Sequence, residues 1–133
     1  TGVLYNDGLI SKVNGQGTGV WTLFLGSRWG DVMLAVDVER STGSAEAVSV
    51  YAAGWSNARE TQKVTFGDVA VAPSSNQGKE FLVAKASASG TALWAVMGGG
   101  AGSDQANGIA VSGEDVVFNV ILTTTSTAER MIQ

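Results

Sequence analysis

The sequence predicts an all-β protein, and three observations lead to that prediction. Apolar residues alternate or form short runs of four to seven, bounded by Gly, Asn, Asp or Ser, which is the pattern of strands and turns. Glycine supplies 18 residues and proline only one. The best candidate helix, Ser44–Tyr51, contains an alternating, β-branched Val-Ser-Val-Tyr segment that favours a strand instead.

The first half of the chain carries four of the predicted strands. Leu9–Val13 and Val20–Leu25 alternate apolar with other side chains, and the Asn14-Gly15 pair between them is a turn signal. Val32–Val38 follows a glycine-containing turn, and Ala47–Ala53 carries the alternating segment named above. This half therefore reads as strands separated by short turns.

The second half carries six more predicted strands. Lys63–Phe66 and Val69–Ala72 are short and flank the turn residues Gly67-Asp68. The remaining predicted strands are Phe81–Lys85, Ala92–Met97, Gly108–Val111 and Val116–Thr123.

An internal repeat links the two halves of the chain. When Leu9 is aligned with Leu82, residues 9–38 fall on residues 82–111 without a gap. Removal of three positions from the first copy then aligns residues 48–50 with residues 118–120. The identical pairs are Leu9/Leu82, Lys12/Lys85, Gly17/Gly90, Thr18/Thr91, Trp21/Trp94, Gly26/Gly99, Asp31/Asp104 and Val38/Val111.

The repeat predicts how the domain is organised. Each copy holds four strands, and a four-stranded antiparallel meander is the unit of a β-propeller blade. We expect a first repeat at residues 1–56, a connecting segment with short strands at 57–79, and a second repeat at 80–133. The predicted architecture is two blade-like repeats; the alternative is a β-sandwich in which the two repeats face each other.

Four segments of the second copy resemble a known family of repeats. They are Phe-Leu-Val-Ala-Lys at 81–85, Ser-Gly-Thr-Ala-Leu-Trp-Ala at 89–95, Gly-Gly-Gly-Ala-Gly-Ser-Asp at 98–104 and Asn-Gly-Ile-Ala-Val at 107–111. These segments resemble the SBBP repeat, a bacterial, secreted repeat of the β-propeller type. The resemblance implies an exported, non-catalytic β-repeat module at the cell surface or outside the cell.

Composition argues against several classes of function. Because the chain has no histidine and no cysteine, it has no Ser-His-Asp triad, Cys-His pair, disulfide or zinc finger. The chain has eight basic residues, which are scattered singly, and twelve acidic residues, so nucleic acid is not an expected partner. No apolar run approaches the ~18 residues of a membrane-spanning helix, so membrane insertion is not expected. No cofactor is expected either.

Two small repeats predict self-association. Repeat folds usually need about three or more units before their apolar faces and strand edges are satisfied. Residues 116–122, Val-Val-Phe-Asn-Val-Ile-Leu, contain no charge that would protect an open edge. We therefore expect the chain to bind copies of itself, as a closed ring if the rotation between copies closes and as a filament if it does not.

The four tryptophans divide into two pairs. Trp21 and Trp94 occupy matching positions in the repeat, which favours a structural role in the core. Trp29 and Trp55 have Gly102 and Thr125 as their counterparts in the alignment, so the repeat does not require them. They are candidates for contact with a ligand or another subunit, including stacking on a sugar.

Acidic residues supply the remaining candidates. Asp104 ends a Gly-Gly-Ala-Gly-Ser-Asp run that matches the start of a calcium-binding nonapeptide, but the counterpart run ending at Asp31 breaks the pattern. Both residues are therefore turn residues first and calcium candidates second, and no metal site is predicted. The pairs Asp37/Glu39 and Glu114/Asp115 could serve a glycosidase only if a cleft set them across from each other.

The sequence thus predicts an exported structural or adhesive protein that is not an enzyme and associates with itself. The alternative is a carbohydrate-binding, lectin-like module with glycans as partners.

Overall fold

The computed structural model describes residues 5–39, 48–59, 61–74 and 78–123, and within them it contains antiparallel strands and no helix. The all-β prediction is confirmed. In the part of the chain that is described, no helix is long and apolar enough to cross a membrane.

The strands follow the predicted order along the chain. They are β1 (Gly8–Val13), β2 (Gly19–Gly26), β3 (Asp31–Val38), β4 (Val50–Ser56), β5 (Val64–Phe66), β6 (Val69–Val71), β7 (Glu80–Ala86), β8 (Ala92–Gly98), β9 (Asp104–Ser112) and β10 (Asp115–Leu122). Every predicted strand overlaps one of them. The largest differences are at β9, which begins at Asp104 and not at Gly108, and at β4, which begins at Val50. Ala47, the predicted start of that strand, lies outside the described residues.

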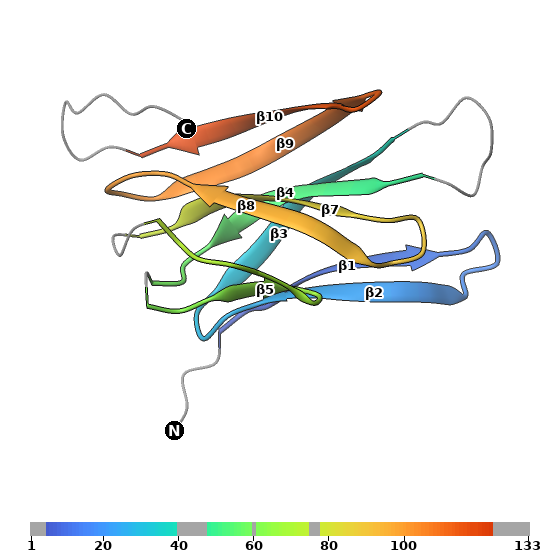
Figure 1. Ribbon diagram of the computed structural model, residues 1–133, viewed down its shortest axis with the longest axis horizontal. Coiled ribbons are helices and arrows are strands. Elements are labelled where there is room, and N and C mark those ends of the chain that lie inside the picture. Colours follow the sequence, from blue (N-terminus) through green and yellow to red (C-terminus); the bar gives the residue numbers. More distant parts are fainter. Residues whose placement is uncertain (1–4, 40–47, 60, 75–77, 124–133) are drawn as a thin grey trace.

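Three sheets are stacked as layers (Figure 1). The lower sheet has the order β1-β2-β5-β6, the middle sheet β3-β4-β7-β8, and the upper sheet contains β9 and β10. One apolar cluster, which includes Leu25, Phe66 and Leu82, lies between the lower and middle sheets. A second, which includes Phe81 and Val83, lies between the middle and upper sheets.

The sheets do not follow the predicted blades. The first repeat places the hairpin β1-β2 in the lower sheet and β3-β4 in the middle one, and the second places β7-β8 in the middle sheet and β9-β10 in the upper one. The physical reason lies in β4 and β7, which are apolar on both faces and pair with each other at the centre of the middle sheet. A four-stranded meander within each repeat is therefore not observed, and neither is a two-sheet sandwich.

The strand registers repeat with the sequence. Each of the hairpins β1-β2, β3-β4, β7-β8 and β9-β10 has one register shift at which a residue has no partner on the neighbouring strand. These residues are Val20 of β2 and its counterpart position Leu93 of β8, and likewise Leu34 of β3 and Asn107 of β9. In the alignment of the two copies, Leu93 is the counterpart of Val20 and Asn107 is the counterpart of Leu34. The two copies thus share the geometry of both hairpins, although each copy is divided between two sheets.

The register corrects the alignment of the last strand. Val38 pairs with Val50, and its counterpart Val111 pairs with Val116, so Val116 of β10 is the counterpart of Val50 in β4. The second copy is therefore shorter than the first by seven positions at this connection, and not by three. The counterpart of Trp55 is accordingly Ile121 and not Thr125, which lies outside the described residues.

Candidate functional site

Among the edge strands of the described sheets, β1 and β10 lie in the two outer layers, at opposite ends of the stack. β1 is an edge of the lower sheet and β10 is an edge of the upper sheet, whereas their counterparts β7 and β4 are interior strands that pair with each other. Leu9 of β1 is 53% exposed and its counterpart Leu82 is fully buried. Val117 of β10 is 69% exposed and its counterpart Tyr51 is 1% exposed. Positions that are buried inside the chain are thus left open at its two ends.

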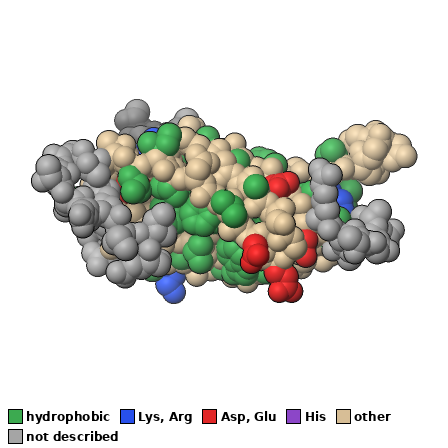
Figure 2. Space-filling model, turned by 90° about the horizontal axis from the view of Figure 1, so that it is seen from above, with side chains coloured by type: hydrophobic (Ala, Val, Ile, Leu, Met, Phe, Trp, Pro, Cys, Tyr) green, Lys and Arg blue, Asp and Glu red, His purple; other side chains and the backbone are tan. Residues whose placement is uncertain are grey.

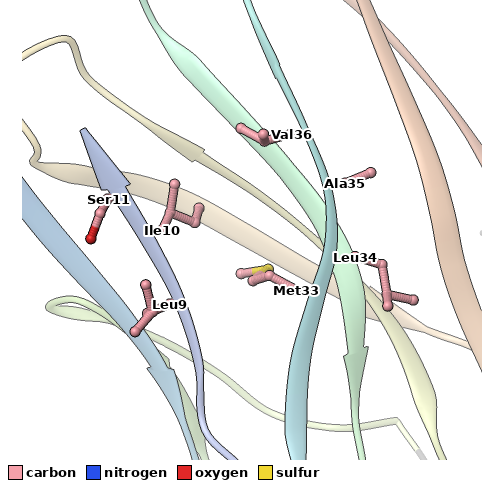
Figure 3. Close-up of a pocket in the computed structure, with 7 residues that line it drawn as sticks. All are labelled: Leu9, Ile10, Ser11, Met33, Leu34, Ala35 and Val36. Carbon is pink, nitrogen blue, oxygen red and sulfur yellow. The ribbon is translucent and has the colours of Figure 1, made fainter. Parts of the chain in front are cut away.

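A groove runs beside the open edge of β1 (Figure 3). It has a volume of about 290 Å³ and is lined by Leu9, Ile10 and Ser11 from β1 and by residues 33–36 from β3. Ile10 and Met33 point toward each other across it, and Val36, which is 58% exposed, lies further along β3 (Figure 3). The side chains that line it are apolar except for Ser11, so the groove suits a strand or another apolar surface better than a charged ligand.

The upper sheet presents a second apolar surface. Val117, Ile121 and Leu122 of β10 are all exposed, and Figure 2, which views the molecule from above, shows apolar side chains spread over this face. The described β10 has one charged residue, Asp115 at its start. An apolar strand edge with a single terminal charge has little protection against pairing with another chain.

Trp21 and Trp94 both pack against the apolar clusters, in the positions predicted for core residues. The Trp21 indole N–H donates to the Ala88 carbonyl oxygen (3.0 Å), and its ring covers Gly90 in the turn between β7 and β8. Trp94 lies against the second cluster and meets the Tyr51 ring edge-on at 6.1 Å. The first tryptophan therefore holds the hairpin of the next repeat in place.

Trp29 and Trp55 lie at one end of the β3-β4 hairpin, and a cation covers each ring. The Arg59 guanidinium carbon is 4.7 Å from the centre of the Trp29 ring, and the Lys79 ammonium is 3.9 Å from that of Trp55. Tyr5 packs against Trp29 at 5.3 Å between ring centres. A sugar that stacked on these faces would displace those contacts, so the sugar-stacking role stays a prediction without geometric support.

Asp31 and Asp104 are both fully buried, at the first position of β3 and of β9. Asp31 accepts a hydrogen bond from the Ser27 hydroxyl (2.8 Å), and Asp104 accepts one from the Gly100 N–H (2.7 Å). Each carboxylate thus binds the residue four positions before it and closes the preceding turn, as the turn interpretation predicts. Among the described residues, no group of three or more acidic side chains could hold a metal ion.

The buried carboxyl of Asp31 predicts a pH-dependent stability. Burial raises the pKa of Asp31 above its usual 3.8, and the Ser56 and Ser27 hydroxyls offset only part of that rise. The folded state therefore holds the proton more tightly, so stability falls as the pH rises from the unfolded pKa through the folded one. We expect Asp31→Asn, which cannot ionise, to gain stability relative to the unmodified chain over that range. Urea unfolding between about pH 3 and pH 7 measures this gain, and a pH-independent difference would contradict it.

Three of the four residues in the two carboxylate pairs have interactions that the structure describes. Both Asp37 oxygens accept backbone hydrogen bonds, from Val38 and from Val111 of β9 (2.9 Å each), so this carboxylate ties β3 to β9. A hydrogen bond with Tyr51 and the charges of Tyr51, Glu39 and Glu114 raise the pKa of Lys85. Glu39 and Glu114, one residue from each pair, thus lie close enough to Lys85 for their charges to act on it.

Comparisons with protein-family models, curated proteins and solved structures find no match to this chain. The resemblance to SBBP repeats therefore has no support from them.

Sequence reasoning missed the groove residues, above all Met33 and Val36. The signal that could have found them is the repeat itself, because their counterparts Ala106 and Ile109 pack against the neighbouring repeat inside the chain.

Proposed function

We propose that this protein is a non-enzymatic structural or adhesive component that assembles with copies of itself. The observation that carries the proposal is the pair of open apolar ends, the β1 edge with its groove and the exposed β10 edge. Unprotected strand edges pair readily with other chains, and apolar surface gains stability when it is covered. The resemblance to secreted repeats implies that this assembly takes place outside the cell.

A filament fits the stacked layers better than a closed ring. The three sheets lie one above another, with the two open edges in the lowest and the highest layer (Figure 1). A contact that joins the top of one copy to the bottom of the next is heterologous, and it lengthens the stack with every copy added.

Particle mass tests the proposal. We expect sedimentation or light scattering of the unmodified chain to give masses well above 13.6 kDa that increase with protein concentration. Because the contact is apolar, added salt should not dissolve the particles, in contrast to an assembly held by surface ion pairs. Negative-stain microscopy then separates filaments from rings. A single 13.6 kDa species at all concentrations would overturn the proposal.

A further inference from the structure

We propose that β10 of one copy inserts beside β1 of a second copy and fills the groove between its β1 and β3. The proposal rests on the proposed function, and it names the occupant of the groove, the strand that enters it and the register of the pairing. Its source is the repeat, because the chain already contains this junction once, between its own two repeats.

The internal junction shows what occupies the groove. In the alignment of the two copies, the groove between β1 and β3 corresponds to the space between β7 and β9. That space is filled by β4, which pairs with β7 and packs against β9. Ala53 of β4 lies there in one buried cluster with Val83 and Ala106, the counterparts of Ile10 and Met33. The groove therefore corresponds to the space that β4 fills inside the chain, but no described strand fills it.

The counterpart of β4 is β10, and β10 has an open edge. Its outward residues Val117, Asn119 and Ile121 are exposed, and they correspond to Tyr51, Ala53 and Trp55 of β4. The counterpart of β4, which is β10, is thus exposed at one end of the stack. The groove that corresponds to the space around β4 lies at the other end. Because a heterologous contact needs two complementary ends, a second copy of this chain supplies what each end lacks.

The pairing register follows from the internal one. Inside the chain, Val50 of β4 pairs with Ala86 of β7. The counterpart of Val50 is Val116, and the counterpart of Ala86 is Val13, so Val116 of one copy is opposite Val13 of the next.

The other pairs follow in the same way. The internal pair Tyr51↔Lys85 places Val117 opposite Lys12, and the last internal pair, Ser56↔Glu80, places Leu122 opposite Asp7. All of β10 from Val116 to Leu122 therefore finds a partner between Asp7 and Val13.

The tryptophans give an independent sign of the same junction. Trp21 covers Gly90 in the turn of the following hairpin, where a Cβ on that glycine would lie 2.5 Å from the ring. The corresponding pair across two copies is Trp94 and Gly17, and no described atom lies within 4 Å of the space above Gly17. Gly17 has nearly the same positive φ as Gly90 (81° and 86°). The turn thus has the shape of the covered turn, but no described residue covers it.

The junction also fixes the spacing of the filament. The upper sheet of one copy merges with the lower sheet of the next, so every copy adds two layers to the stack. Since packed sheets lie ~10 Å apart, we expect an axial rise of about 20 Å per copy.

Paired cysteines test the register, because the natural chain contains none. In the variant with Lys12→Cys and Val117→Cys, the two thiols of one chain lie in the lowest and highest sheets and cannot meet. Across the proposed junction they are directly opposite. Mild oxidation should therefore give a ladder of covalent trimers and longer chains on a non-reducing gel, whereas either single variant should stop at dimers.

The control variant combines Lys12→Cys with Asn119→Cys, which moves one thiol two positions along the same face. A diagonal pair of this kind is about 7–8 Å apart, too far for a disulfide, so the ladder should be lost. Large particles with no ladder for the first variant, or with equal ladders for both, would overturn this junction and leave self-association standing. Single molecules without any ladder would overturn both.

Discussion

Gly54→Ala is expected to destroy the fold, although it adds only one methyl group. A Cβ at this position would overlap the Val32 carbonyl oxygen and lie 3.0 Å from the Met33 Cα. Both are backbone atoms of β3 and cannot rotate away, so β3 and β4 would have to separate at the centre of the middle sheet. We expect a loss of on the order of 3–5 kcal/mol in the free energy of unfolding, a large part of the stability of a small domain.

Urea or thermal unfolding followed by circular dichroism measures this loss. The matched control is Gly19→Ala, also within a strand, where a Cβ would meet no atom within 4 Å. That variant should keep or slightly raise the stability, because alanine loses less backbone entropy on folding than glycine does. Equal stability of the two variants would show that β3 and β4 do not approach each other as closely as described.

Local pattern predicts the strands of this protein better than it predicts their partners. Alternation and turn residues locate every strand, because they depend on a few neighbouring positions. β4 pairs with β7, which is distant from it in the sequence. The rule that consecutive strands form hairpins does not predict this pairing. One local signal was present: segments such as Phe81–Lys85 are nearly continuous apolar runs, typical of strands buried on both faces.

The candidate site was predictable only in part. Open edges follow from two small repeats with an uncharged final segment at residues 116–122, which lies in β10, whereas self-association stays a prediction. The groove could not be derived, because it exists only once β3 leaves the sheet of β1 and crosses above it. The misalignment of the last strand also hid the correspondence between Trp55 and Ile121. Short repeats of apolar and small residues align almost equally well at several offsets, whereas hydrogen-bond register allows one.

Two assembly-blocking variants should stay monomeric alone and form a dimer when mixed. Val117→Lys places a charge on the strand that enters the groove, opposite Lys12 of the next copy, and Val36→Lys places one on the groove itself. Both valines are exposed in the single chain, so each variant should fold normally. Tyr51, the counterpart of Val117, is 1% exposed, so a lysine at position 117 would be buried beside the positive charge of Lys12 at the junction. At about 3 kcal/mol or more, that burial weakens association at least about a hundredfold.

The mixture gives the sharper result, because head-to-tail assembly leaves each variant one intact end. The Val36→Lys chain keeps a normal β10 and the Val117→Lys chain keeps a normal groove, so one junction can form and no further copy can add. Sedimentation should show a 1:1 dimer in the mixture and single chains in each separate solution. The control is Val20→Lys, at another exposed valine whose counterpart Leu93 remains exposed inside the chain, and it should assemble as the unmodified protein does. If the mixture stayed monomeric while the Val20→Lys variant assembled, the two ends would not be complementary, and a symmetric contact between like edges would have to replace the head-to-tail one.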